Sequence, residues 1–373
     1  MKILILSVTA GGGHFATARA MEDMLKSKGA DVKVVDIYKY INYFLYSIID
    51  KGCAFSTSRT PDIFGAVYSY LENRNRPEFD FDALQLVNAL CAFRFEGFIE
   101  DYGPDAIICT HVFAAQIINE LRKRNKISIP TVGIITDYTI HPYWGSVLYI
   151  DHIVLASELL VYRAMKRGIG KGRIQTFGIP IHPKFCGKLE KSEARRCLNL
   201  PETGKMVLVM LGSLGQGDMF DISRHIRKVD PEIMQLIVCG KNKRLYSKLL
   251  KYKEDNRENG LYVYGFVDNV DVMMDAADCI ITKPGGMTVS ETLAKRLPMI
   301  VVDPIPGHEE RNTEFLLNNG VCLEVTRTFP LEEAVYYMFE NPRRAQAMSE
   351  YMAVIGRPRA TENLSDFVLE LIK

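Results

Sequence analysis

The chain has 373 residues, of which 47% are apolar and 24% charged, and its formal net charge is +1. Since a domain usually spans roughly 100–200 residues, this length predicts two domains, each with a core of its own. The near-neutral charge gives no overall attraction for nucleic acid, so we expect no nucleic-acid partner. None of the eight cysteines pairs at Cys-x-x-Cys spacing, so we expect free thiols in a reducing compartment, with no disulfide framework and no metal site.

Short apolar runs alternate with helical patterns in the first half of the chain. The runs are rich in β-branched residues and bounded by Gly, Pro or charge, as buried parallel strands are. We expect strands at 3–8, 32–37, 106–110, 131–136, 152–156 and 174–178. A helix is expected over 14–28, ended by Gly29. Alternating strands and helices predict a parallel sheet covered by helices, and we assign residues 1–180 to this first domain.

Residues 38–102 break this rhythm, because they contain many aromatic residues and no clear strand. Apolar residues recur at helical spacing in YINYFLYSIID, so we expect a helical insertion in the first domain. Its helices either pack on the core or form an amphipathic surface that meets a bilayer or a lipid tail. Basic clusters at 122–126 and 163–173 are either solvated helix ends or contacts for anionic lipid headgroups.

The sequence GIPIHPKFCGK, residues 178–188, is the expected joint, because its prolines and glycines interrupt all periodicity. A second series of strands is expected at 206–212, 234–239, 261–267, 278–283 and 298–302. We assign residues 187–345 to a second domain and residues 346–373 to C-terminal helices that pack back on the first. Two such series predict an α/β protein with two doubly wound domains.

Three glycine-rich turns join a predicted strand to a predicted helix, an arrangement that binds anions at the helix N-terminus. The first, in SVTAGGGH, lacks the spacing of a dinucleotide fingerprint. Asp36 nevertheless ends the next strand, where such a fold places its ribose-binding acid, so an NAD or FAD site is one interpretation. The other two turns, in VLVMLGSLGQGD and IITKPGGMTVSETL, lie in the second domain and favour a sugar nucleotide.

Backbone N–H groups of these two turns could hold a diphosphate without a metal ion, because glycine leaves room for close approach. The groups belong to Gly212, Ser213, Gly215, Gly286, Met287 and Thr288. Glu291, one helical turn further on, could accept hydrogen bonds from both ribose hydroxyls. Backbone groups of Phe266, at a strand end, could pair with a pyrimidine edge. Each turn taken alone also fits an ordinary strand–helix connection.

Several motifs together resemble the diacylglycerol glycosyltransferases. They are GGGH, TDYTIHPYW, CGKNKRL, GFVDNV and KPGGMTVSE followed by DPIPGHEERN, and they extend over nearly the whole chain. The family includes the monogalactosyldiacylglycerol synthases of plastids and the processive diacylglycerol glucosyltransferases of Gram-positive bacteria. The wider family contains the transferase that adds N-acetylglucosamine to the lipid-linked peptidoglycan precursor. The resemblance implies a GT-B fold, with two Rossmann-like domains facing a deep cleft, and an inverting, metal-independent reaction without a cofactor.

Donor-binding residues are also implied by the resemblance. Glu291 would bind the ribose and Phe266 the uracil, whereas Ser213 and the 285–288 turn would bind the diphosphate. Glu309 and Asn312 would contact the sugar hydroxyls. The whole implied donor set is Gly212, Ser213, Gly215, Gly240, Lys241, Asn242, Phe266, Val267, Gly285, Gly286, Met287, Thr288, Glu291, Glu309 and Asn312. The family's PGQE motif is PGHE here, with His308 in place of glutamine, which leaves the donor sugar open.

The acceptor side carries the implied catalytic residues. His14 would be the general base, because a neutral imidazole can take a proton at cytosolic pH and a helix N-terminus disfavours the imidazolium. Asp137 would orient or stabilise a histidine or the acceptor. The remaining acceptor residues would be Gly12, Gly13, Tyr143 and Trp144.

The function implied is transfer of a hexose from UDP-glucose or UDP-galactose to diacylglycerol or a glycosyldiacylglycerol, which makes a membrane glycolipid. No apolar run reaches the ~20 residues of a spanning helix, so we expect a cytoplasmic protein bound peripherally to an anionic surface, the inner face of the cell membrane. The alternatives are transfer to an isoprenoid-linked or other acceptor, a UDP-sugar epimerase, and a non-catalytic UDP-sugar sensor.

Overall fold

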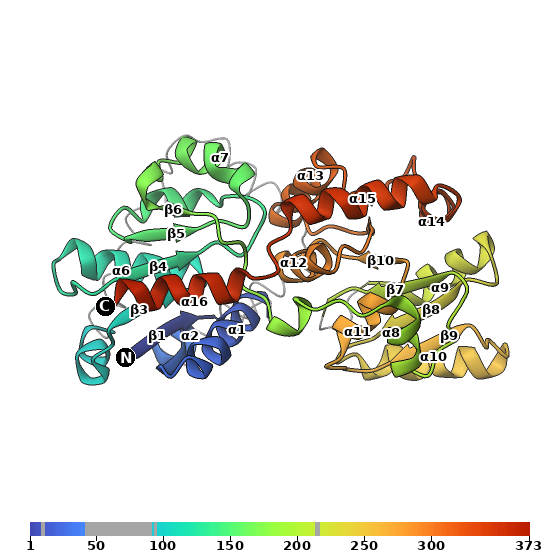
Figure 1. The fold of residues 1–373 in the computed structure, drawn as a ribbon, viewed down its shortest axis with the longest axis horizontal. Coiled ribbons are helices and arrows are strands. Elements are labelled where there is room, and N and C mark those ends of the chain that lie inside the picture. The colour runs from blue at the N-terminus through green and yellow to red at the C-terminus, as the bar shows by residue number, and fades with distance from the viewer. Residues whose placement is uncertain (9–11, 42–91, 93–94, 213–216) are drawn as a thin grey trace. The chain divides into compact units, whose positions relative to one another are not determined.

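The computed structural model describes residues 1–8, 12–41, 92, 95–212 and 217–373. The chain forms two compact units (Figure 1). The first comprises Met1–Pro183, Ile305–His308 and Arg359–Lys373, and the second comprises Lys184–Pro304 and Glu309–Pro358. Most of the expected insertion at 38–102, together with Ser213 and Gly215, lies outside the described residues.

The first unit is built on a parallel sheet in the order β2-β1-β3-β4-β5-β6. Its strands are β1 (Lys2–Ser7), β2 (Asp31–Asp36), β3 (Ala106–Cys109), β4 (Thr131–Ile134), β5 (His152–Val154) and β6 (Ile174–Gln175). The helices include α1 (Gly13–Ser27), α2 (Ile37–Ile41), α6 (Val112–Lys123), α7 (Val161–Lys166) and α16 (Ala360–Leu371), and residues 95–102 are helical as well. Short 3₁₀ turns are η1 (Pro142–Ser146), η2 (Glu158–Leu160) and η3 (Lys171–Arg173), and η4 (Pro183–Phe185) spans the boundary with the second unit.

Helices α1 and α16 share one hydrophobic core with strands of the first sheet. Leu364 and Val368 of α16 are fully buried there, although they lie at the opposite end of the chain from β1. The Phe367 ring also lies 5.2 Å from that of Phe177, and Lys28 pairs with Asp366 at 2.6 Å. The last helix therefore belongs to the first unit by packing (Figure 1).

The second unit has a parallel sheet in the order β12-β11-β10-β7-β8-β9. Its strands are β7 (Met206–Met210), β8 (Met234–Val238), β9 (Leu261–Tyr264), β10 (Cys279–Thr282), β11 (Met299–Val301) and β12 (Cys322–Glu324). The helices are α8 (Lys191–Cys197), α9 (Met219–Val229), α10 (Lys243–Asp255), α11 (Val270–Ala276), α12 (Gly286–Lys295), α13 (His308–Asn318), α14 (Leu331–Glu340) and α15 (Pro342–Ile355). β7, β8 and β10 are apolar throughout or nearly so and are buried, as parallel strands covered on both faces require.

Three details differ from the sequence-based expectations. Strand β12 was not expected, because its three residues form too short an apolar run to signal a strand. The expected strands 174–178 and 261–267 are shorter than predicted, since β6 ends at Gln175 and β9 at Tyr264. The C-terminal segment is also divided, because α15 belongs to the second unit and only α16 to the first.

No helix in the described part of the chain is both long and apolar enough to cross a bilayer.

Candidate functional site

The strand order of the first sheet creates a topological switch point between β1 and β3. The chain leaves β1 toward β2 on one side and later returns to β3 on the other. In open α/β sheets, ligands bind at the carboxyl ends of the strands beside such a point. His14 lies there, near the start of α1, together with Thr110, which directly follows β3. The switch point thus brings together residues from separate parts of the sequence.

His14 is anchored through one ring nitrogen. Its Nδ1 lies 2.9 Å from the carbonyl oxygen of Thr110 and 2.8 Å from the hydroxyl oxygen of Thr136. A carbonyl oxygen only accepts hydrogen bonds, so we assign the proton of the neutral ring to Nδ1. Nε2 then carries the lone pair, which is the form that a general base requires.

Two further histidines, His111 beside His14 and His141 near His111, have the opposite hydrogen-bond pattern. His111 caps α6, and its Nδ1 accepts from the backbone N–H of Phe113 at 3.1 Å. His141 caps η1, and its Nδ1 accepts from the backbone N–H of Tyr143 at 3.3 Å. In both neutral rings the proton is therefore on Nε2. The His111 ring meets the His14 ring edge-on, with 4.6 Å between centroids.

All three imidazoles are held toward the neutral form. Burial lowers the pKa of His14 below its usual value; Asp137 and the Thr110 carbonyl oppose this shift, and His308 adds to it. Burial, with His14 and His141 nearby, places the pKa of His111 well below its usual value. Burial also lowers the pKa of His141 to about 4. A neutral His14 at pH 7 is consistent with its expected role as a base.

The remaining acceptor residues have mixed environments. Asp137 is half-buried and close enough to raise the pKa of His14, which fits its expected supporting role. Gly12 is exposed with φ +77°, and Gly13 begins α1. Trp144 is only 4% exposed, and its ring packs so tightly on Gly133 of β4 that an added Cβ there would lie 2.7 Å away. Packing, and not an accessible acceptor surface, accounts for the position of this ring.

The second sheet has its own switch point, between β7 and β10. The turn after β7 begins at Gly212, which is exposed and has φ +82°. The turn after β10 leads directly into α12, whose cap is Gly285. The first turn of a helix directs its N–H groups out of its N-terminal end, so Gly286, Met287 and Thr288 present theirs at this sheet edge.

The Gly285 turn is supported from α13. A Cβ on Gly285 would lie 3.6 Å from Oε1 of Glu309, so the Glu309 carboxylate lies directly against the turn. Asn312 is fully buried, and its amide donates to the carbonyl oxygen of Pro284 at 2.9 Å. Asn312 thus fixes the turn. The sequence predicted a contact with the sugar for this residue, and not this structural role.

Glu291 is an expected donor residue whose carboxyl group is strongly perturbed. Burial raises its pKa to about 8; Lys184 opposes this shift and Asp271 adds to it. Lys184 lies 3.8 Å from the Asp271 carboxylate and also donates to the carbonyl oxygen of Asp268. The free protein therefore holds Glu291 mainly protonated at pH 7.

The other expected donor residues follow β8 and β9. Gly240 adopts φ +57° after β8, and Asn242 caps α10 by accepting from the N–H of Leu245 at 3.0 Å. Phe266 is 66% exposed, and the Lys241 ammonium lies 5.9 Å from its ring centroid. Val267, the next residue, is half-buried. An exposed aromatic ring beside a flexible cation suits a base-binding surface.

The structure adds residues that sequence reasoning missed. Thr110 and Thr136 contact His14 across sequence separations of 96 and 122, which no local pattern reveals. Lys283 is half-buried, and its Cε lies 3.9 Å from the position of a Cβ on Gly217. This cation therefore lies between the two glycine turns of the second unit. In the sequence, the position of Lys283 two residues before Gly285 could have indicated that it lies at this turn.

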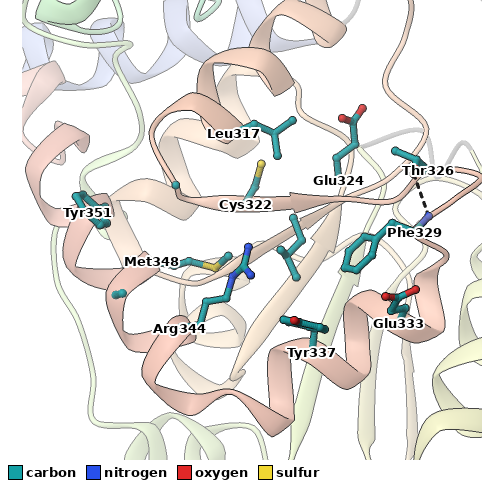
Figure 2. Close-up of a pocket in the computed structure, with 13 residues that line it drawn as sticks. Leu317, Cys322, Glu324, Thr326, Phe329, Glu333, Tyr337, Arg344, Met348 and Tyr351 are labelled. Atoms are coloured by element: carbon teal, nitrogen blue, oxygen red, sulfur yellow. Dashed lines mark hydrogen bonds between the residues drawn. The ribbon is translucent and has the colours of Figure 1, made fainter.

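A groove of about 570 Å³ in the second unit lies apart from these residues. It runs along β12 between the end of α13 and helices α14 and α15 (Figure 2). None of the expected donor residues lines it. Across the described ranges, no group of three or more His, Cys, Asp or Glu side chains is placed to hold a metal ion.

Comparison with known proteins agrees with this two-unit arrangement. Residues 14–181 match the monogalactosyldiacylglycerol (MGDG) synthase family, and residues 206–364 match the glycosyltransferase family 28 C-terminal domain. The chain is 28% identical to a processive diacylglycerol beta-glucosyltransferase of Bacillus cytotoxicus, over 99% of this chain and 93% of the relative. A relative with the same description from Bacillus pumilus is 26% identical, over 99% and 94%.

Solved structures share the fold at low sequence identity. MurG of Acinetobacter baumannii superposes with a TM-score of 0.65 at 14% identity, over 99% of both chains. The UDP-GlcNAc 2-epimerase of Neisseria meningitidis gives 0.61 at 13% identity, over 99% of this chain and 100% of the epimerase. The fold and the family matches together define a glycosyltransferase of GT-B architecture. More particularly, the first half of the chain is similar to the MGDG synthase family, and the second half is similar to the glycosyltransferase family 28 C-terminal domain.

Proposed function

We propose that the chain transfers a hexose from a UDP-sugar to diacylglycerol or a glycosyldiacylglycerol, with inversion at the anomeric carbon. The observation that carries the reaction type is the anchoring of His14 at a switch point, with Nδ1 engaged and Nε2 left as the basic nitrogen. The acceptor class is supported by relatives described as diacylglycerol glucosyltransferases, which align with 99% of this chain.

In this proposal, His14 activates the acceptor. Nε2 takes the proton of the acceptor hydroxyl while the hydroxyl oxygen attacks the anomeric carbon, and the bond from that carbon to the UDP oxygen breaks. The ring becomes an imidazolium, and the Thr110 carbonyl and the Asp137 charge stabilise it, since both raise the pKa of His14. The leaving diphosphate gains negative charge at the same moment.

The second unit stabilises that leaving group. N–H groups of Gly286, Met287 and Thr288 at the start of α12 face the diphosphate in place of a metal ion, and Lys283 adds a positive charge. Glu291, as a carboxylate, accepts from the ribose hydroxyls. A metal-independent reaction predicts that turnover is unchanged by an excess of chelator.

We further infer that the first unit binds an anionic membrane surface through a face around α7. This face exposes large apolar side chains: Leu148, Tyr149, Leu159, Tyr162 and Met165. Arg163, Lys166 and Lys171 are exposed among them, and each basic residue near an anionic bilayer contributes about 1 kcal/mol. The face adjoins the segment that carries His141, because Arg163 donates to the Thr139 hydroxyl at 3.3 Å. Membrane contact would thus bring lipid acceptors close to His14.

Incubation with radiolabelled UDP-glucose or UDP-galactose and diacylglycerol vesicles tests the proposal, with thin-layer separation of the lipids. We expect label in a glycolipid from one of the two donors, and unlabelled lipid with both donors would contradict the proposal. The same assay with a glycosyldiacylglycerol or an isoprenoid phosphate defines the acceptor.

A UDP-sugar epimerase is the second candidate, because the Neisseria epimerase shares the fold with a TM-score of 0.61. An epimerase converts its UDP-sugar without an acceptor. Formation of the epimer, or of free UDP with no glycolipid, in vesicle-free reactions would favour this candidate over transfer.

A further inference from the structure

We propose that Thr136 is a positioning residue, which together with the Thr110 carbonyl fixes the proton of His14 on Nδ1 and leaves the Nε2 lone pair for the acceptor. This proposal rests on the function proposed above, in which His14 is the base. It assigns to a neutral hydroxyl and a backbone carbonyl the orienting role that a carboxylate often has behind a catalytic histidine.

The support for His14 comes from the carboxyl ends of three neighbouring strands. Ser7 ends β1, Thr110 follows β3, and Thr136 follows β4 by two residues. Ser7 and Thr110 are fully buried, and Thr136 is 8% exposed. The Thr110 hydroxyl donates to the Ser7 hydroxyl at 2.9 Å, which fixes this segment while its carbonyl faces His14. The ring is therefore held by rigid elements.

Both contacts converge on the same nitrogen. The Thr110 carbonyl accepts only, so it selects the protonated state of Nδ1. The Thr136 oxygen, at 2.8 Å from Nδ1, shares that proton as a second acceptor. His111 and His141 differ, because the Nδ1 of each accepts a backbone N–H. His14 is therefore the Nδ1–H tautomer, whereas His111 and His141 are Nε2–H tautomers. Of these three rings, His14 is the one whose basic nitrogen, Nε2, is not the nitrogen that makes these hydrogen bonds.

The same contacts stabilise the product of proton transfer. When the acceptor O–H bond breaks, its proton moves to Nε2 and the Nδ1–H bond stays, so the positive ring needs acceptors at Nδ1. Thr110 and Thr136 supply them without adding a charge. Among the described residues, the charged or titratable groups that face His14 are Asp137, His111 and His308. Of these, only Asp137 favours the imidazolium.

Thr136→Val removes the hydroxyl and keeps the shape of the side chain, and Thr136→Ser restores the hydroxyl. We expect Thr136→Val to lower kcat by roughly three- to tenfold with KM unchanged, which is the effect of one lost hydrogen bond. The acidic limb of its kcat–pH profile should move to lower pH, because the imidazolium loses an acceptor. Thr136→Ser should return both values toward wild type. A Thr136→Val profile that superposes on the wild type would overturn the proposal.

NMR of histidine-labelled protein without substrate separates this proposal from the proposed function. The ring ¹⁵N shifts of His14, assigned by their loss in His14→Gln, report which nitrogen carries the proton. We expect Nδ1–H in the wild type and a lower titration midpoint for His14 in Thr136→Val than in Thr136→Ser. Nε2–H in the wild type would overturn the proposal, whatever the activity. The expected shifts in a protein that transfers no sugar would instead contradict the function alone.

Discussion

The two units have the same kind of switch point in their sheets, but different chemical groups lie beside it. In the first unit, a side chain occupies the position beside the strand ends, and residues after β3 and β4 fix the orientation and proton of His14. In the second unit, backbone groups occupy that position, because Gly285 and Gly286 add no side chain of their own at the start of α12. In the proposed function, one edge moves a proton and the other holds an anion.

Burial also has different consequences for the protonation of His14 and of Glu291. Burial keeps His14 neutral, which is the state that a base needs before turnover. Burial keeps Glu291 protonated, which is the opposite of the state that accepts ribose hydroxyls. Under the proposed roles, His14 is in its working protonation state before a ligand binds, whereas Glu291 loses a proton when ribose binds.

The largest effect is expected from His14→Ala. Loss of the general base should lower kcat by roughly 10²–10⁴-fold, because the acceptor hydroxyl then attacks without proton removal. UDP affinity, measured by calorimetry, should stay within error of the wild type, since the donor residues belong to the second unit. His225→Ala, on α9 of that unit, is the matched control and should leave both values unchanged. Near-wild-type turnover of His14→Ala would remove this ring from the mechanism.

Glu291→Ala tests the other switch point. At pH 9, where the carboxyl group is ionised, the variant should bind UDP about ten- to a hundredfold more weakly, because hydrogen bonds to a charged group contribute about 1.5–3 kcal/mol. Its turnover at saturating donor should change much less. Glu333→Ala, in the groove of Figure 2, is the control for loss of a carboxylate elsewhere in the unit. Equal UDP affinity of Glu291→Ala and wild type would discard the ribose contact.

The sequence indicates the second switch point better than the first. The glycine turn before α12 and Glu291 lie within seven residues of one another, so a local pattern suffices to find them. His14 itself is also predicted as a site residue, because it follows a glycine turn. Its partners are not, since Thr110 and Thr136 approach it only when β1, β3 and β4 become neighbours in the sheet.

Most strands of the fold were also predictable, because they are marked by local patterns in the sequence. Strands such as β7 and β10 are continuous apolar runs, which signal buried parallel strands. Strand β12 lies at the sheet edge with three residues, and its position depends on pairing with β11 and not on its own pattern. Trp144 is a second example. Its ring packs on Gly133, which accounts for its burial, and no spacing in the sequence predicts that contact.

The protonation difference between the two sites can be measured directly. Since burial raises the pKa of Glu291 to about 8, this group is mainly neutral at pH 7 and mainly ionised at pH 9. If ribose binds the carboxylate, UDP affinity should rise about tenfold over this range, which is the increase in the ionised fraction. Glu291→Gln should show a flat profile. Calorimetry in two buffers of different ionisation enthalpy should also detect proton release at pH 7, and its absence would contradict the assignment.

The smallest effect concerns the membrane, where the two units can be compared by matched tyrosines. Tyr162 on α7 and Tyr351 on α15 are 69% and 59% exposed. Tyr162→Ser should lower binding to vesicles rich in anionic phosphatidylglycerol by roughly fivefold, because burying part of such a ring contributes about 1 kcal/mol. Tyr351→Ser should leave binding unchanged, since the exposed apolar and basic residues of the proposed docking face belong to the first unit around α7. Co-sedimentation measures both, and an equal loss for the two variants would mean that the α7 face is not the docking surface.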